Sequence, residues 1–143
     1  MGKWSNILDG DVAASTSPAS HVAALRFPKL EGWAPGRVWA TWPVEDDFVT
    51  PVGPLFGGYL AALADHLMAN ALFTVLEDHE VFSTTDLHTS FLRAVRGGVV
   101  RVEATVVSRG RRTAFCDAEF RNGAGELVAR ASATQAISEM RTP

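Results

Sequence analysis

The stretch PVGPLFGGYLAALADHLMANAL, residues 51–72, predicts the central element of the fold. Its apolar residues recur at steps of three and four, which is the period of an α-helix. We expect this helix to begin near Gly57 and to end near Glu77. Apolar residues also occupy most of its remaining circumference, so it must be covered on most sides. Asp65, two turns inside the helix, is either a structural carboxylate paired with a nearby arginine or a group with a chemical role.

Four segments after the helix alternate apolar and polar residues with the period of a β-strand, and glycine-containing turns separate them. They cover residues 83–94, 98–110, 112–121 and 125–138. Residues 37–42, RVWATW, are a further strand candidate. Consecutive strands at short spacing indicate an antiparallel meander rather than βαβ units. We therefore predict an α+β fold in which one long central helix is wrapped by a curved antiparallel sheet.

Length and composition limit the other possibilities. A chain of 143 residues is typical of one domain, which we place at residues 21–143, after a small, polar and flexible N-terminal segment over residues 1–20. The net charge of −3 predicts no attraction to nucleic acid. The apolar window 57–76 contains Asp65, His66 and Asn70, so we interpret it as a buried helix rather than a membrane span. A single cysteine, Cys116, and the absence of a signal-peptide pattern predict a cytoplasmic protein.

The pair Gly57-Gly58 and the acid at 65 match the pattern of a known family. That pattern reads Asn-x-x-Gly-x-x-His-Gly-Gly, with an acid eight residues after the first glycine of the pair. Here it is Thr50-Pro-Val-Gly-Pro-Leu-Phe56-Gly57-Gly58 followed by Asp65, and residues 85–93, 107–111 and 125–129 also match. Over residues 24–137 the chain resembles the PaaI-type acyl-CoA thioesterases, which have the hotdog fold.

The resemblance implies hydrolysis of an acyl- or aryl-acyl-CoA to the free acid and CoA. It implies no cofactor, since coenzyme A takes part only as a portion of the substrate. Thr84 or Thr85 stands where the family has a Ser or Thr that assists the acid, and we assign Thr84 to that role. The positions of Thr50, Phe56, Gly58 and Thr85 are expected to contact the substrate. The family forms dimers, in some members paired into tetramers.

The residues themselves support a role in carbonyl chemistry. Hydrolysis of a thioester needs an oxyanion donor and a carboxylate that acts as base or nucleophile. The N–H of Gly57 lies at a predicted helix N-terminus, where unpaired donors favour developing negative charge. Asp65 supplies the carboxylate. We predict these two groups and Thr84 as the catalytic residues.

The spacing of Gly57 and Asp65 predicts a composite site. Eight residues at about 1.5 Å rise place them about 12 Å apart along the helix, although both must lie within about 3 Å of one reacting carbonyl. An antiparallel two-fold pairing of two such helices would bring Gly57 of one chain opposite Asp65 of the other. We therefore expect a homodimer with two composite active sites, or a dimer of such dimers.

Three arginines flank the predicted turn at Gly110. Arg109, Arg111 and Arg112 are interpreted either as a solvated turn or as ligands of the coenzyme A phosphates, because a guanidinium suits phosphate geometry. The four histidines show no metal-ligand spacing, so we predict no metal site.

Two departures from the family pattern keep a second function open. Thr50 replaces Asn and Phe56 replaces His, and the resemblance implies that those side chains orient the attacking water and the carbonyl. A non-hydrolytic acyl-CoA or lipid-binding protein is therefore the alternative to an enzyme, whose rate these replacements would lower. A hotdog dehydratase or hydratase is a third option, for which the sequence offers no paired Asp and His at the expected sites.

Overall fold

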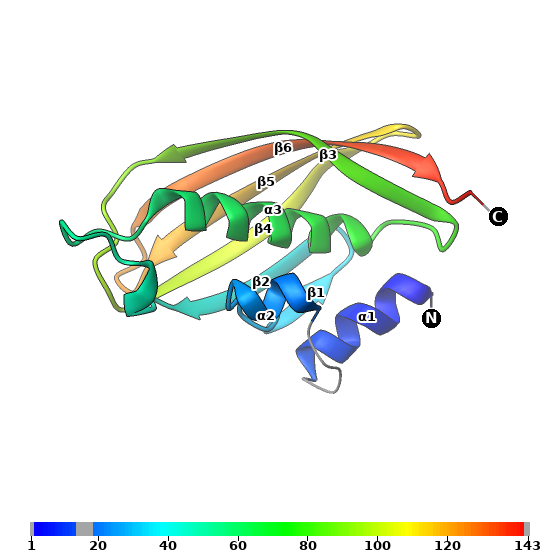
Figure 1. The fold of residues 1–143 in the computed structure, drawn as a ribbon. Coiled ribbons are helices and arrows are strands. Elements are labelled where there is room, and N and C mark those ends of the chain that lie inside the picture. The colour runs from blue at the N-terminus through cyan, green and yellow to red at the C-terminus, as the bar shows by residue number, and fades with distance from the viewer. Residues whose placement is uncertain (1, 14–18, 142–143) are drawn as a thin grey trace.

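A six-stranded antiparallel sheet curves around one long helix in the computed structural model, which describes residues 2–13 and 19–141 (Figure 1). The helices are α1 (Lys3–Val12), α2 (Ser20–Ala24) and α3 (Gly57–Phe73), with a 3-10 turn, η1, at Asp46–Phe48. The strands are β1 (Gly32–Ala34), β2 (Arg37–Pro43), β3 (Glu80–Phe91), β4 (Val99–Arg109), β5 (Thr113–Asn122) and β6 (Leu127–Glu139). The predicted α+β arrangement, one long helix wrapped by a curved antiparallel sheet, is confirmed.

Small side chains let α3 lie close against the sheet. The inward face of β5 and β6 carries a run of small, almost fully buried side chains. They are Ala114, Cys116, Ala118, Ala129, Ala131 and Ala133. Burial raises the pKa of the Cys116 thiol to about 12, so this cysteine stays protonated at neutral pH.

The strand order corrects the prediction of a simple meander. The sheet runs β1-β2-β4-β5-β6-β3, so β3 pairs with β6 rather than with the strand that follows it. The edge of β4 is taken instead by β2, with Val38 opposite Ala104. Alternation identifies a strand by its two faces, whereas the partner along each edge depends on segments far away in the chain. The consequence is that β3 stands at one end of the sheet.

One face of α3 remains open. The buried residues of α3 are Asn70 and the apolar Tyr59, Leu60, Leu63, Ala64, Leu67, Met68, Ala71 and Leu72. On the other side Gly58 is exposed, and Ala62, Asp65 and Ala69 are half-buried. In Figure 1 this face lies between β3 on one side and α1 and α2 on the other. Among the described residues, no helix is long and apolar enough to span a membrane.

The helix ends earlier than predicted, at Phe73 rather than near Glu77. The hydroxyl of Thr74 donates to the carbonyl of Ala71 at 2.6 Å and accepts the N–H of Gly36, also at 2.6 Å. Such side-chain bonds compete with the next helical turn. Thr74 therefore joins the end of α3 to the β1–β2 turn.

The N-terminal segment differs from the flexible stretch expected over residues 1–20. Residues 3–12 form α1, whose Leu8 is only 1% exposed. Asp9 accepts the indole N–H of Trp33 at 2.9 Å, and Asp11 accepts the backbone N–H of Leu30 at 2.7 Å. Polar residues that suggest a mobile segment in the sequence thus serve as hydrogen-bond acceptors. The rest of the expected segment includes residues 14–18, which lie outside the described residues.

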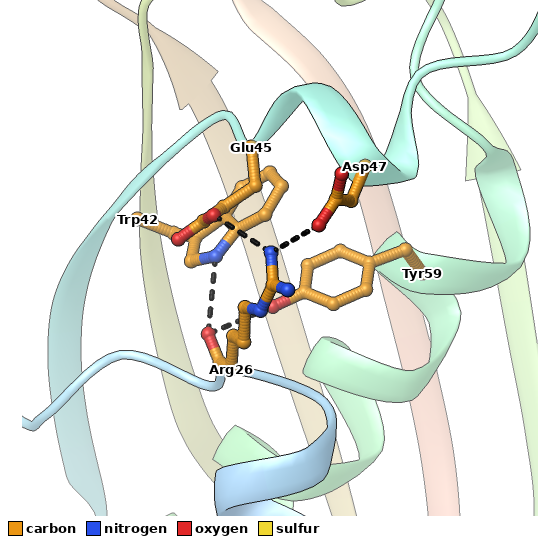
Figure 2. A network of polar contacts seen from close by, with 5 residues as sticks. All are labelled: Arg26, Trp42, Glu45, Asp47 and Tyr59. Atoms are coloured by element: carbon orange, nitrogen blue, oxygen red, sulfur yellow. Dashed lines mark hydrogen bonds and ion pairs between the residues drawn. The ribbon is translucent and has the colours of Figure 1, made fainter.

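A polar network fixes the connection between α2 and the rest of the domain (Figure 2). The carbonyl of Arg26 accepts the indole N–H of Trp42 and the hydroxyl of Tyr59, each at 3.2 Å. Its guanidinium forms ion pairs with Glu45 at 3.0 Å and Asp47 at 2.8 Å. Arg26 therefore links η1, β2 and α3 to the end of α2.

Candidate active site

The carboxylate of Asp65 lies on the open face of α3, beside the edge strand β3. The hydroxyl of Thr84 donates to Asp65 Oδ1 at 2.9 Å, which joins the helix to the strand. Asp65 Oδ2 has no hydrogen-bond partner among the described residues. A half-buried carboxylate with one oxygen held and the other available suits a group that accepts a proton from a bound molecule.

A β-bulge in β3 explains why Thr84 and Thr85 take different roles. Thr84 pairs with Gln135 of β6, but the register shifts by one residue before Asp86 pairs with Thr134. Thr85 is the extra residue, and its hydroxyl donates to the carbonyl of Thr134 at 3.1 Å. Bulges redirect side chains within a strand. The bulge thus directs the Thr84 side chain toward α3, whereas the Thr85 side chain forms a hydrogen bond within the sheet.

Gly57 begins α3, with Phe56 as its N-cap residue in an extended conformation. The first amides of a helix have no acceptor within it, so they and the helix dipole favour a developing oxyanion. A cavity of about 220 Å³ at this end of the helix is lined by Gly57, Leu60, Phe91 and neighbouring residues. A Cβ atom at Gly57 would lie 3.0 Å from the Phe91 ring, so the absence of a side chain keeps this entrance open.

The remaining predicted substrate contacts lie in several places. The hydroxyl and the N–H of Thr50 both bond to the carbonyl of Pro54, at 2.9 and 2.8 Å, and so close a loop. The ring of Phe56 is 59% exposed and covers Gly58, where an added Cβ would lie 2.6 Å from it. Thr50 therefore shapes the approach to α3, while Phe56 presents an apolar surface beside its N-terminus.

The three predicted phosphate ligands separate into two groups. Arg109 forms an ion pair with Glu80, and its guanidinium is only partly exposed. Burial by itself would raise the pKa of Glu80, but hydrogen bonds from Arg109 and from the backbone together outweigh it and lower that pKa. Arg111 and Arg112 are exposed and line a cavity of about 510 Å³ with His79, Glu139 and others. These two side chains are available to an anionic ligand.

A pair of polar residues to which the sequence pattern assigned no role, His66 and Asn70, lies on the side of α3 that faces α1 and α2. His66 lies close to Asn70, with 3.4 Å between His66 Nε2 and Asn70 Nδ2, and stacks on Phe27 with ring centres 4.6 Å apart. Burial lowers the pKa of His66 to about 4. The four-residue step from His66 to Asn70 was the available signal, but the sequence does not show that α1 and α2 would cover them.

No metal centre is formed within residues 2–13 and 19–141, where no three His, Cys, Asp or Glu side chains gather closely enough to hold an ion. The candidate site therefore consists of Asp65 with Thr84 and, about 12 Å away along the same helix, the N-terminal amide of Gly57.

The sequence and the fold both match known proteins. Residues 53–129 match the pattern of the family described as Thioesterase superfamily. Human acyl-coenzyme A thioesterase 13 is 28% identical over 126 residues, which are 87% of this chain and 89% of that protein.

Two solved structures illustrate the likeness in fold. A thioesterase from Haemophilus influenzae gives a TM-score of 0.80 at 25% identity and covers 92% of this chain and 90% of its own. A phenylacetic acid degradation-related protein from Ralstonia eutropha also gives 0.80, at 31% identity, with 93% and 98% covered. The family match spans more than half of the sequence and includes Gly57, Asp65 and Thr84. This chain therefore belongs to the thioesterase superfamily.

Proposed function

We propose that the protein is an acyl-CoA thioesterase. Water adds to the thioester carbonyl, the carbon–sulfur bond breaks, and the products are the free acid and the thiol of coenzyme A. The observation that carries this proposal is the hydrogen bond from Thr84 to Asp65 on the open face of a helix that begins with Gly57. The name of the human relative, an acyl-coenzyme A thioesterase, supports the substrate class.

Each group has a separate role in this reaction. Asp65 acts as the base that takes a proton from the attacking water, and this proton finally reaches the departing sulfur. Thr84 holds one carboxylate oxygen and so orients the other. The N–H of Gly57 stabilises the negative charge that develops on the carbonyl oxygen. No metal or cofactor takes part.

The active form is a homodimer with composite sites. Gly57 and Asp65 lie on one continuous helix, about 12 Å apart along its axis, so one chain cannot present both to the same carbonyl. β3 runs antiparallel to α3, because Thr84 contacts Asp65 whereas Phe91 lies against Gly57. A two-fold axis that places Gly57 opposite the Asp65 of a second copy would therefore pass near Ala61.

The edge strand supports this arrangement. β3 is 12 residues long, stands at the end of the sheet, and carries the exposed side chains of Leu87 and Phe91. The unpaired N–H and C=O groups along a long edge strand favour pairing with another strand. Pairing of two β3 strands about an axis near Leu87 and His88 would extend the sheet and bring the two α3 helices together.

The coenzyme A portion would extend toward Arg111 and Arg112. These exposed guanidinium groups suit the phosphates, and their cavity adjoins Glu80, at the start of the strand that carries Thr84. Arg109 takes part indirectly, because its ion pair with Glu80 fixes this corner of the sheet.

A complementation experiment tests both the chemistry and the composite site. Asp65→Asn removes the base, and Gly57→Pro removes the N–H donor while remaining compatible with the first position of a helix. Because the proline ring would also lie close to Phe91, Gly57→Ala, which adds a Cβ but keeps the N–H, is the matched control. The extended backbone of Phe56 also accommodates a following proline. Asp65→Asn and Gly57→Pro alone are each expected to release no thiol above background from a panel of acyl-CoAs, whereas the wild type does.

Mixed dimers give the decisive result. If the two variants are refolded together in equal amounts, half of the dimers are mixed and each contains one intact site, so about a quarter of wild-type activity returns. No recovery, in mixtures shown to exchange subunits, would place both groups in one chain and contradict the composite site. A wild-type protein that releases no thiol from any acyl-CoA would reject the enzymatic function itself.

One observation favours a second candidate function, the binding of acyl-CoA without hydrolysis. The Thr50 hydroxyl is engaged by Pro54, and Phe56 has no polar side-chain atom, so neither residue can orient water. Calorimetry that finds tight acyl-CoA binding, with the thioester intact after hours, would favour this function over the enzyme.

A further inference from the structure

The N-terminus of α3 is held by a short loop that begins at η1. The carbonyl of Phe48, the last residue of η1, accepts the N–H of Phe56 at 2.8 Å, and Val49 pairs with Leu55 in an isolated β-bridge. Phe56 is the N-cap residue of α3, and its carbonyl shares one planar peptide group with the N–H of Gly57. The position of η1 therefore sets the direction of the proposed oxyanion donor.

The side chain of Arg26 clamps η1 through two charges and one ring. Its guanidinium forms ion pairs with Glu45 at 3.0 Å and with Asp47 at 2.8 Å (Figure 2). Glu45 directly precedes η1, and Asp47 lies within it. The same guanidinium lies 5.7 Å from the centre of the Phe48 ring. One side chain thus contacts η1 at its start, its middle and its end.

The backbone of Arg26 is tied to the same place. Its carbonyl accepts the indole N–H of Trp42 and the hydroxyl of Tyr59, each at 3.2 Å (Figure 2). Tyr59 lies in the first turn of α3, and its ring stacks on Phe48 with centres 4.4 Å apart. Contacts from both parts of Arg26 therefore converge on η1 and on the first turn of α3.

The conformation of Arg26 is a second, independent indication. The N–H of Phe27 donates to the carbonyl of Val22 at 3.1 Å. The N–H of Arg26 donates to that of Ala23 at 3.2 Å, and the two bonds form the Schellman pattern that ends a helix. Arg26 takes the left-handed position of this pattern, with a φ of 51°, where glycine is the usual residue. Such conformations of other residues cluster at functional sites, where surrounding contacts maintain them.

We propose that Arg26 is a positioning residue for the thioesterase reaction. By clamping η1 it holds Phe56, and with it the N–H of Gly57, in the direction that stabilises the oxyanion. This inference rests on the proposed function and adds a residue that acts without touching the substrate. A misplaced donor loses stabilisation of the transition state while the binding of acyl-CoA changes little, so the effect belongs to kcat rather than to KM.

The first test makes the same substitution at two arginines. Arg26→Gln removes the guanidinium from η1. Arg37→Gln is the matched control, because Arg37 also pairs with an exposed glutamate, Glu103, at 3.0 Å and lies 4.9 Å from the centre of an aromatic ring, that of Trp39. Arg37 begins β2, whereas η1 follows the end of that strand. The two variants thus lose similar contacts, and only one of them loses the clamp.

Arg26→Gln is expected to lower kcat at least about tenfold and to leave KM within about twofold of the wild type. Arg26→Lys keeps a charge that can pair with one carboxylate, so its kcat should stay within about threefold of the wild type. Asp47→Asn weakens the clamp from the side of η1 and should show a smaller loss of the same kind. Arg37→Gln should retain both wild-type constants.

The second test reports on the loop without any need for catalysis. Amide hydrogen exchange at Phe56 measures how often its bond to Phe48 opens. In Arg26→Gln this exchange should be at least about tenfold faster than in the wild type, while the amides of β5 keep their protection. A merely structural role would accelerate the β5 amides as well. Arg37→Gln should leave both rates unchanged.

The proposed function and the role of Arg26 can fail separately. A wild type that releases no thiol from any acyl-CoA would reject the function, and the exchange rate at Phe56 would still decide whether Arg26 holds the start of α3. If the wild type is active but Arg26→Gln keeps its kcat, or loses no more than Arg37→Gln, Arg26 is not a positioning residue and the thioesterase function stands. Exchange at Phe56 that is unchanged, or that rises together with exchange in β5, would also overturn the inference.

Discussion

Lowering the pH from 7 to 5 is expected to destabilise this protein through His66. The pKa of His66 is about 4 in the folded protein, below its ordinary value of 6.5, and burial is the main cause. Nearby Asp11 and Asp65 favour the charged form and His21 opposes it. Below pH 6.5 the unfolded chain therefore binds a proton that the folded protein does not. Stability falls as the pH drops from about 6.5 toward 4.

The magnitude follows from the two pKa values. A pH of 5 lies about 1.5 units below the pKa of His66 in the unfolded chain. Protonation of the unfolded chain therefore lowers the free energy of unfolding by about 2 kcal/mol, at 1.36 kcal/mol per unit. The imidazole lines a cavity that water can reach, so screening reduces this to about 1–2 kcal/mol. The range from pH 5 to 7 lies above the pH at which ordinary carboxylates titrate. Because the pKa of Glu80 is lowered, its contribution to the pH dependence of stability also falls below this range.

Urea unfolding at pH 7, 6 and 5, at one fixed protein concentration, measures this loss. His66→Phe retains an aromatic ring opposite Phe27 but cannot bind a proton, so its stability should change at least about 1 kcal/mol less between pH 7 and 5. His88→Gln is the matched control and should retain the wild-type slope, since His88 is exposed on β3 and does not act on His66. Equal slopes in His66→Phe and the wild type would refute the assignment of this pH dependence to a buried, neutral His66.

Three further variants test other parts of the structure. Gln135→Met should raise the free energy of unfolding by about 1–3 kcal/mol in urea titrations, because the fully buried amide of Gln135 has no nitrogen or oxygen partner among the described residues and only the weakly bonding thiol of Cys116 nearby; an unchanged or lower value would show that the amide is satisfied in solution. Thr84→Val removes the bond to Asp65 and should lower kcat about 10- to 100-fold in the thiol-release assay, while Thr84→Ser keeps most of the rate; similar rates for both would mean that the bond has no catalytic role. Glu80→Gln weakens the partly buried ion pair with Arg109 and should cost about 1–3 kcal/mol in thermal unfolding, and no measurable loss would mark the pair as energetically neutral.

The central helix and the positions of Gly57 and Asp65 on it could be predicted because they depend on the local sequence pattern. The three- and four-residue steps of residues 57–73 report which face is buried, and the glycine pair marks where the helix begins. Alternation identified β2 to β6 within a few residues of their observed bounds, whereas the three-residue β1 was not predicted. The spacing of Gly57 and Asp65 then followed from helix geometry alone.

The assembly of these elements depends on contacts between residues far apart in the chain. β3 lies beside β6 because β2 occupies the edge of β4, and neither pairing leaves a signature in a strand's own alternation. The same holds for α1, whose aspartates bond to Leu30 and Trp33 and thereby close the cavity beside His66. The sequence by itself determined the helix, the strands and the distance between Gly57 and Asp65, since periodicity reports local burial. Only the tertiary structure decided that Thr84 would meet Asp65 and that the N-terminal helices would cover His66, because those contacts join segments whose partners are set by long-range packing.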